Sequence, residues 1–139
     1  MTLATELSRA RELASRGAPP AEAADVLERV VRAAGESHAV LDALEGVAKG
    51  RALLRFTDSE DAFEFGAGGG TLSIARADRR GPGPKVDAAS ATWLGLMGGT
   101  LKPWLAFTRG LVVCRAGLTE LRWLQQVAER MQQGYLQAQ

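Results

Sequence analysis

Residues 90–110 read SATWLGLMGGTLKPWLAFTRG and carry more structural information than any other part of the chain. Ser90 predicts the capped start of a helix, the pair Gly98-Gly99 predicts its end, and Pro103 predicts the start of a second short helix. Large apolar side chains crowd into this stretch, while no reactive group recurs in it. A chain that concentrates tryptophan, leucine and methionine in this way is building an apolar surface or cavity, not a polar catalytic centre.

Apolar periodicity predicts the elements on either side of this stretch. Apolar residues three and four positions apart predict helices in the first third of the chain, and an alternating pattern after residue 50 predicts a β-hairpin and a third antiparallel strand. Two further strands flank the short helices, and an amphipathic helix ends the chain. The expected helices cover about 3–16, 20–35, 37–47, 90–97, 103–107 and 121–135, and the expected strands cover 52–56, 62–65, 72–75, 85–89 and 111–114.

Composition narrows the class of protein. A length of 139 residues with 46% apolar and 24% charged residues is typical of one soluble globular domain. The net charge of +1 is too small to drive binding to nucleic acid, so we expect no such partner. The single cysteine, Cys114, and the lack of a long apolar run favour a cytoplasmic protein, and the high content of Ala, Gly and Arg is typical of a bacterium.

Polar clusters in the chain have simple structural interpretations. The acidic segment 58–64 has no histidine or cysteine spaced to join it, so we expect a solvated hairpin turn and no metal site. The glycine run 66–70 lacks the ending of a phosphate-binding loop, which predicts a strand connection and no nucleotide cofactor. His38 is expected near a helix start, and the basic loop 76–85 is expected to be a charged loop that could assist docking to a membrane surface.

From about Gly50 onward, the order of elements resembles the sterol carrier protein type 2 family of lipid-binding domains. Two segments carry the resemblance most clearly: WLGLMGGTLKP at 93–103 is similar to the family's apolar helix and glycine turn, and AFTRGLVV at 106–113 is similar to its strand start. Thr100 replaces the family's usual lysine after the glycine turn. Residues 1–36 form a helical extension that the resemblance does not cover, so the expected division is 1–36 and 37–139 within one globular unit.

The resemblance implies an α+β fold with a curved, largely antiparallel five-stranded sheet and helices packed on one face. It also implies an apolar tunnel that holds a sterol, fatty acyl chain, isoprenoid or polyketide-like molecule without covalent attachment, for transfer or presentation. Shape and apolar contact suffice for such binding, since burying about 300 Å² gains roughly 7 kcal/mol before the costs of association. The expected ligand-binding residues are Trp93, Leu96, Met97, Trp104, Phe107, Leu121 and Leu124.

Two other classes of function stay open at this stage. A small enzyme, or an accessory protein of a biosynthetic pathway, would enclose and steer a hydrophobic intermediate, and a carboxylate pointing into the cavity would favour it. The carboxylates to inspect are Glu64, Asp78, Asp87 and Glu120. A pure interaction module would instead expose an apolar patch on its N-terminal helices. A transient contact with a biosynthetic enzyme is compatible with either carrier or accessory role.

Overall fold

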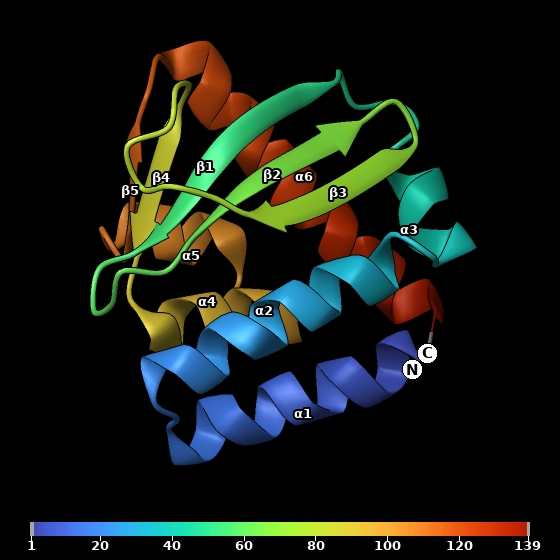
Figure 1. The fold of residues 1–139 in the computed structure, drawn as a ribbon. Coiled ribbons are helices and arrows are strands. Elements are labelled where there is room, and N and C mark those ends of the chain that lie inside the picture. The colour runs from blue at the N-terminus through green and yellow to red at the C-terminus, as the bar shows by residue number, and fades with distance from the viewer. Residues whose placement is uncertain (1, 139) are drawn as a thin grey trace.

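The computed structural model describes residues 2–138 and has five strands in one sheet, with the helices gathered on one side of it (Figure 1). In chain order the elements are α1 (Leu3–Arg16), α2 (Pro20–Ala34), α3 (His38–Ala43), β1 (Gly50–Phe56), β2 (Ala62–Gly68), β3 (Thr71–Arg76), β4 (Lys85–Ala88), α4 (Ser90–Gly98), α5 (Pro103–Thr108), β5 (Val112–Arg115) and α6 (Leu118–Ala138).

The sheet has the strand order β3-β2-β1-β4-β5. Neighbouring strands are antiparallel except for β1 and β4, which run parallel, with Leu54 opposite Val86. The expected α+β class and the largely antiparallel five-stranded sheet are therefore confirmed, with one parallel pair that makes the sheet mixed. In this order β4 lies beside β1, the central strand, instead of following β3 at the edge of the sheet.

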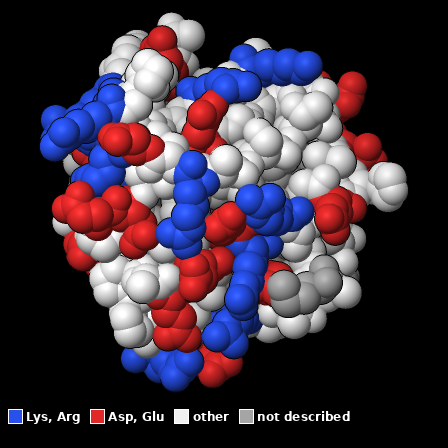
Figure 2. All heavy atoms as spheres, viewed as in Figure 1, with Lys and Arg blue, Asp and Glu red and all other residues white. Residues whose placement is uncertain are grey.

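The two faces of the sheet differ in chemistry. Side chains such as Leu54, Phe65 and Val86 face the helices and belong to the main hydrophobic cluster. On the other face, Asp87 bonds to Arg55 and Arg115. Since side chains alternate between the faces of a strand, this alternation separates an apolar interior from a charged exterior. Figure 2 shows Lys and Arg interspersed with Asp and Glu over the described surface in that view, with no large area of one sign.

Helix α4 is the centre of the helical side. All of its residues except Ala91 are buried, because α1 and α2 pack on it from one side and the cavity described below lies on the other. Gly98 permits the close approach of α1, since a Cβ there would lie 3.3 Å from the backbone nitrogen of Arg11. The Arg11 Nε–H donates a 2.8 Å hydrogen bond to the Gly98 carbonyl oxygen.

The start of α4 differs from the expectation. Ser90 is the first helical residue and not the cap; the flanking Ala89 has no capping side chain. The cap comes from the β1–β2 turn, where Asp58 accepts hydrogen bonds from the Ser90 backbone N–H and from its hydroxyl at 2.6 Å. A carboxylate at a helix N-terminus also interacts favourably with the helix dipole, so the acidic turn helps to fix α4 against the sheet.

Helices α1 and α2 bury their apolar faces within the molecule. The boundaries of α1 match the sequence prediction, and residues from both helices belong to the same hydrophobic cluster as the sheet. Among the described residues, the large exposed hydrophobic side chains are Trp104, Leu111, Val113, Leu118 and Leu136, and each lies outside α1 and α2. The observation that would favour a pure interaction module is therefore missing from this part of the structure.

Helix α3 is shorter than expected and ends at Ala43 instead of continuing to residue 47. The residues that follow form turns in which Leu44 and Val47 stay buried, so their apolar spacing reflects burial and not helical structure. Helix α6 packs against α3, and the close contact is at Gly134, where a Cβ would lie 2.7 Å from the Val40 Cα.

Candidate ligand-binding cavity

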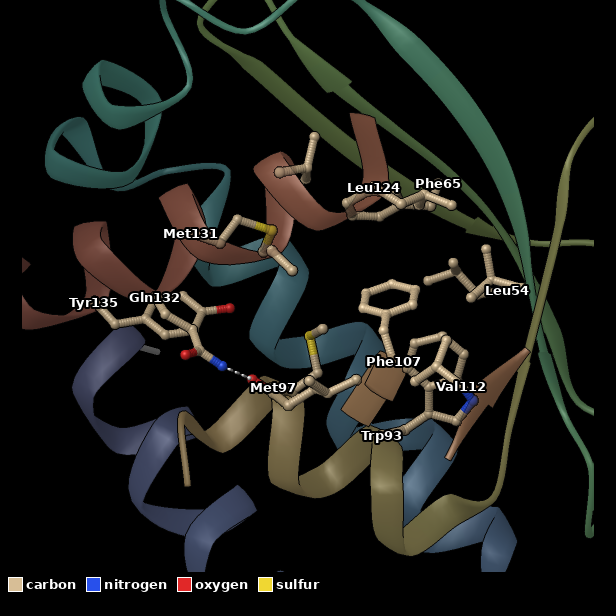
Figure 3. A pocket seen from close by; sticks show the side chains of 14 residues that line it. Leu54, Phe65, Trp93, Met97, Phe107, Val112, Leu124, Met131, Gln132 and Tyr135 are labelled. Carbon is tan, nitrogen blue, oxygen red and sulfur yellow. Dashed lines mark hydrogen bonds between the residues drawn. The ribbon is translucent and has the colours of Figure 1, made fainter. Parts of the chain in front are cut away.

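A cavity of about 50 Å³ lies between the inner face of the sheet and helices α4, α5 and α6 (Figure 3). Its wall is almost entirely apolar, and it is contributed by four strands and three helices that are far apart in the sequence. The lining residues are Leu54, Phe65, Val86, Trp93, Leu96, Met97, Phe107, Val112, Leu124, Val127, Ala128, Met131, Gln132 and Tyr135.

The structure brings together most of the residues expected from the sequence. Trp93, Leu96, Met97, Phe107 and Leu124 all line this cavity, from α4, α5 and α6. These side chains converge because their helices pack on the same face of the sheet.

Trp104 and Leu121 lie outside the cavity wall. Trp104 is 50% exposed, because the buried side of α5 is formed by Pro103 and Ala106. A helix turns about 100° per residue, so the position after Pro103 points sideways to solvent. Leu121 lies one turn before Leu124 on α6 and is half-buried beyond the end of the cavity.

Trp93 is held firmly in the wall. Its side chain is 4% exposed, and the ring packs near Phe56 with centroids 6.2 Å apart. The indole N–H donates a 3.3 Å hydrogen bond to the Arg55 carbonyl oxygen. The indole nitrogen is thereby satisfied by the protein itself, which leaves the apolar part of the ring for contact within the cavity.

Residues of the sheet and the C-terminal half of α6 were missed by sequence reasoning. Leu54, Phe65 and Val86 read as ordinary core positions, since alternation shows which side of a strand is buried but not that a gap lies above it. Met131 and Tyr135 share the apolar stripe of α6 with Leu124, and that shared stripe is the signal that could have identified them.

Gln132 and Tyr135 are the polar residues of the wall and lie together at one end of it (Figure 3). The Gln132 Nε2 group donates hydrogen bonds to the carbonyl oxygens of Leu96 at 3.2 Å and Leu101 at 3.0 Å. Tyr135 is 2% exposed, and its hydroxyl has no hydrogen-bond partner among the described residues. Burial raises the pKa of the Tyr135 hydroxyl well above its ordinary value of 10.0, so the group is neutral at physiological pH.

The carboxylates that would indicate catalysis in the cavity lie elsewhere: none of Glu64, Asp78, Asp87 and Glu120 lines the cavity in the described structure. Asp87 is buried, but it faces the opposite side of the sheet, where Arg55 contacts it at 2.6 and 2.8 Å and Arg115 at 2.9 Å. The hydrogen bond from Arg55 is the main reason that the pKa of Asp87 lies below its usual value, with that from Arg115 adding to it. Glu64 is exposed and pairs with Arg51.

The basic loop lies away from the cavity and is bound to the protein itself. Arg76 pairs with carboxylates that include Asp25 of α2 at 2.7 Å. The Arg79 guanidinium donates hydrogen bonds to the backbone carbonyls of Phe56 at the end of β1, at 2.7 Å, and of Ser59 in the β1–β2 turn, at 3.0 Å. These arginines fasten the loop to the fold and do not form a mouth to the cavity. The described residues hold no group of three or more acidic, histidine or cysteine side chains that could bind a metal ion.

Solved structures with the same arrangement of elements identify the fold. The crystal structure of sterol carrier protein 2 matches with a TM-score of 0.59 at 20% identity, covering 85% of this chain and 96% of that protein. The chain has the sterol carrier protein 2 fold. A conserved hypothetical protein from Thermus thermophilus, described as a candidate sterol carrier protein, shares this fold with a TM-score of 0.58 and 19% identity over 81% of this chain and 85% of that one.

A third protein with this fold is UbiJ-SCP2, a ubiquinone synthesis protein, with a TM-score of 0.50 and 8% identity over 78% of this chain and 88% of that protein. No model of a protein family matches the sequence, and no curated protein matches it either. No helix within residues 2–138 is long and apolar enough to span a membrane.

Proposed function

We propose that this protein binds a hydrophobic small molecule non-covalently in the cavity beneath the sheet, and that it transfers or presents this molecule to another site. The observation that carries the proposal is the convergence of an apolar wall around one cavity, contributed by β1, β2, β4, β5, α4, α5 and α6. Concave, mostly apolar sites with a few polar groups are the usual form of small-molecule pockets. The name of sterol carrier protein 2, whose fold this chain shares, agrees with a ligand of this kind.

The cavity must widen to accept such a ligand, because about 50 Å³ is far below the roughly 300 Å³ or more of a typical small-molecule pocket. Helix α5 is the wall element best suited to move. It has six residues, of which only Pro103 and Ala106 are buried, and it lies between Gly99 and Gly110, whose backbone φ angles are 79° and 71°. Glycine joints at both ends allow the segment to swing outward, and the flexible side chains of Met97 and Met131 then adjust to the ligand.

Helix α6 sets the length of the proposed site. Leu124 and Tyr135 line the cavity eleven positions apart, which corresponds to about 16 Å along the helix. This distance suits an elongated apolar molecule more than a compact one. We propose Trp93, Leu96, Met97, Phe107 and Leu124 as ligand contacts, and we omit Trp104 and Leu121 because of where they lie.

Passive binding is favoured over steering of a chemical step. The cavity wall contains no Asp, Glu, His, Lys or Arg among the described residues, and the hydroxyl of Tyr135 is a poor acid or base because its pKa is raised. A transient contact with a membrane surface or with an enzyme that supplies or receives the ligand belongs to the same proposal, since a carrier needs a donor and an acceptor.

The test is to measure binding of an apolar fluorescent probe, pyrene, together with native mass spectrometry of the purified protein. We expect saturable binding of one pyrene per chain, and a co-purified apolar species released by lipid extraction. Absence of both would contradict the proposal.

Two variants on α5 localise the binding. Phe107→Ala removes a side chain from the wall and is expected to weaken pyrene binding about tenfold or more, by loss of buried apolar contact. Trp104→Ala removes a larger aromatic side chain from the same helix outside the wall, and it is expected to leave binding unchanged. Equal effects of the two substitutions would place the ligand elsewhere.

A further inference from the structure

Four of the five large apolar side chains that are exposed among the described residues lie between positions 104 and 118. Their exposed fractions range from 42% to 63%. Strand β5 is an edge strand, and Figure 1 shows α5 and the start of α6 at its two ends. We call this region the β5 edge surface; its apolar members are Trp104, Leu111, Val113 and Leu118. Exposed apolar side chains gathered in this way mark a surface that makes contacts.

The β5 edge surface is also basic. Positions 102–122 hold one acidic residue, Glu120, and four basic residues: Lys102, Arg109, Arg115 and Arg122. Arg115 is paired with Asp87 of β4. The other three basic side chains are exposed and have no carboxylate within ion-pair distance among residues 2–138. Since the whole chain carries a net charge of only +1, the positive charge of this segment is a local feature.

We propose that the β5 edge surface docks on a lipid bilayer that contains anionic phospholipids. Trp104, Leu111 and Leu118 lie among the headgroups and the adjoining parts of the acyl chains, and the basic side chains contact the lipid phosphates. Tryptophan is enriched at membrane–water interfaces, because one end of its ring system is apolar and the other is polar. The inference rests on the proposed function, and it names the partner and the surface through which the apolar ligand is collected or delivered.

The charge of the surface favours a bilayer over a second copy of the chain. Two β5 edge surfaces facing each other would bring their unpaired basic side chains together, and this repulsion opposes a symmetric dimer. Anionic headgroups attract the same side chains, and each basic residue close to such a bilayer adds to the affinity.

Other parts of the described chain are less suited to this role. Helices α1 and α2 bury their apolar faces within the molecule and expose no large apolar side chain. In the loop at 76–85, Arg76 and Arg79 are bound to the protein itself. The β5 edge surface alone combines exposed apolar side chains with unpaired basic ones among the described residues.

Docking at this surface brings the lipid next to the wall of the cavity. Trp104 and Phe107 belong to the same six-residue helix, and Phe107 lines the cavity whereas Trp104 lies outside it. Val112, between the exposed Leu111 and Val113, lines the cavity as well. The bilayer therefore contacts α5, the element that we propose to move, so that the cavity opens toward lipid and not toward water.

The experiment measures co-sedimentation of the protein with lipid vesicles. We expect the wild-type chain to bind vesicles of about one third phosphatidylglycerol and two thirds phosphatidylcholine at least about tenfold more tightly than vesicles of phosphatidylcholine alone, and added salt to reduce the difference. Trp104→Ala should weaken binding to the anionic vesicles about tenfold, because the exposed half of this side chain is available for insertion. Arg109→Gln should weaken it about fivefold.

Matched controls are available for both kinds of substitution. Leu118→Ser should weaken binding about fivefold, whereas Leu136→Ser, which replaces a more exposed leucine near the other end of α6, should leave it unchanged. Arg29→Gln removes an exposed arginine of α2 and should change binding by less than about twofold. Because all these side chains are exposed, the Tm of each variant should match that of the wild type.

Three results would overturn the inference. Equal binding of the wild type to anionic and neutral vesicles is the first, and binding to neither, which would leave the surface to an acidic partner protein, is the second. The third is an equal loss of binding in Leu118→Ser and Leu136→Ser, because the docking surface would then lie elsewhere. A dimer in sedimentation equilibrium that Leu118→Ser converts to a monomer would also overturn it, since a second copy would then cover the surface.

Pyrene binding separates this inference from the proposed function. If the wild type binds pyrene but no vesicles, the inference fails and the proposed function stands. If it binds anionic vesicles but no pyrene, the proposed function fails, and with it the role of this surface in delivering a ligand. Trp104→Ala should lose affinity for vesicles while it keeps its affinity for pyrene, because Trp104 lies outside the cavity wall.

Discussion

Filling the cavity should stabilise the protein and abolish ligand binding at the same time. Ala128 lines the cavity from α6, and its replacement by leucine adds apolar volume to the space of about 50 Å³ without changing the helix propensity appreciably. An empty cavity costs about 24 cal/mol per Å³, so complete filling would recover about 1.2 kcal/mol. For a chain of this length that corresponds to an increase in Tm of about 4 °C.

The assay combines thermal unfolding with pyrene titration on Ala128→Leu. The matched control is Gln126→Leu, which places the same side chain on the exposed face of the same helix and is expected to change neither property appreciably. The reasoning is refuted if Ala128→Leu binds pyrene as tightly as the wild type, because an occupied cavity could not then be the binding site. A loss of stability together with a loss of binding would show that the wall is already fully packed at this position.

Four further outcomes are expected. Gly134→Ala should destabilise the fold by about 1–2 kcal/mol in denaturant unfolding, because the new Cβ would lie 2.7 Å from Val40 Cα. The cost of this overpacking exceeds the gain in helix propensity from alanine. Gly46→Ala serves as the control, since a Cβ at Gly46 would meet no atom within 4 Å. Because the pKa of Asp87 is lowered in the fold, its ion pairs stabilise the protein fully above the unfolded pKa of 3.8, and this contribution is lost as pH falls through the lower folded pKa. Asp87→Asn should cost about 2 kcal/mol of stability at pH 7 and should reduce the loss of stability at acidic pH. If the loss of stability at acidic pH is the same in Asp87→Asn, other groups cause it. The pKa of Tyr135 is raised, so its effect on stability appears at alkaline pH: stability is kept below the unfolded pKa of 10.0 and falls as pH rises above it. Tyr135→Phe should therefore lose less stability than the wild type when the pH is raised. Identical stability curves for the two proteins would contradict the burial of this hydroxyl. In hydrogen exchange, the backbone amides of α5 should exchange faster than those of α4, and bound pyrene should slow the exchange of the α5 amides. Equal protection of the two helices would argue against α5 as the moving wall.

The fold was largely predictable because its signals are local. Helix α1 and the strands of the hairpin follow from apolar spacing, and the order of elements after residue 50 indicated the sheet with its helices on one face. The parallel pairing of β1 with β4 was not predictable from periodicity, since both directions bury the same alternate residues. The role of Asp58 as the cap of α4 was also not predictable from local patterns, because its partner Ser90 is 32 positions away in the chain.

The residues that line the cavity were predictable only on the helices. The expected residues of α4 line the cavity because apolar side chains occur on all sides of that helix. Trp104 does not line it, because a large aromatic residue in a six-residue helix can face either way. From the sequence, Tyr135 can be recognised only as one residue of the apolar stripe of α6. Its unpaired hydroxyl depends on what surrounds it in space, which no spacing rule contains.

Because α1 and α2 pack on α4 and leave it almost completely buried, we expect the rest of the chain to depend on these two helices. Their removal at residue 36 would leave the underside of α4, including the glycine surface that now contacts Arg11, open to water. Such a shortened polypeptide would expose a broad apolar surface next to the wall of the proposed ligand-binding cavity. The N-terminal segment is therefore expected to keep the cavity wall formed by α4 intact.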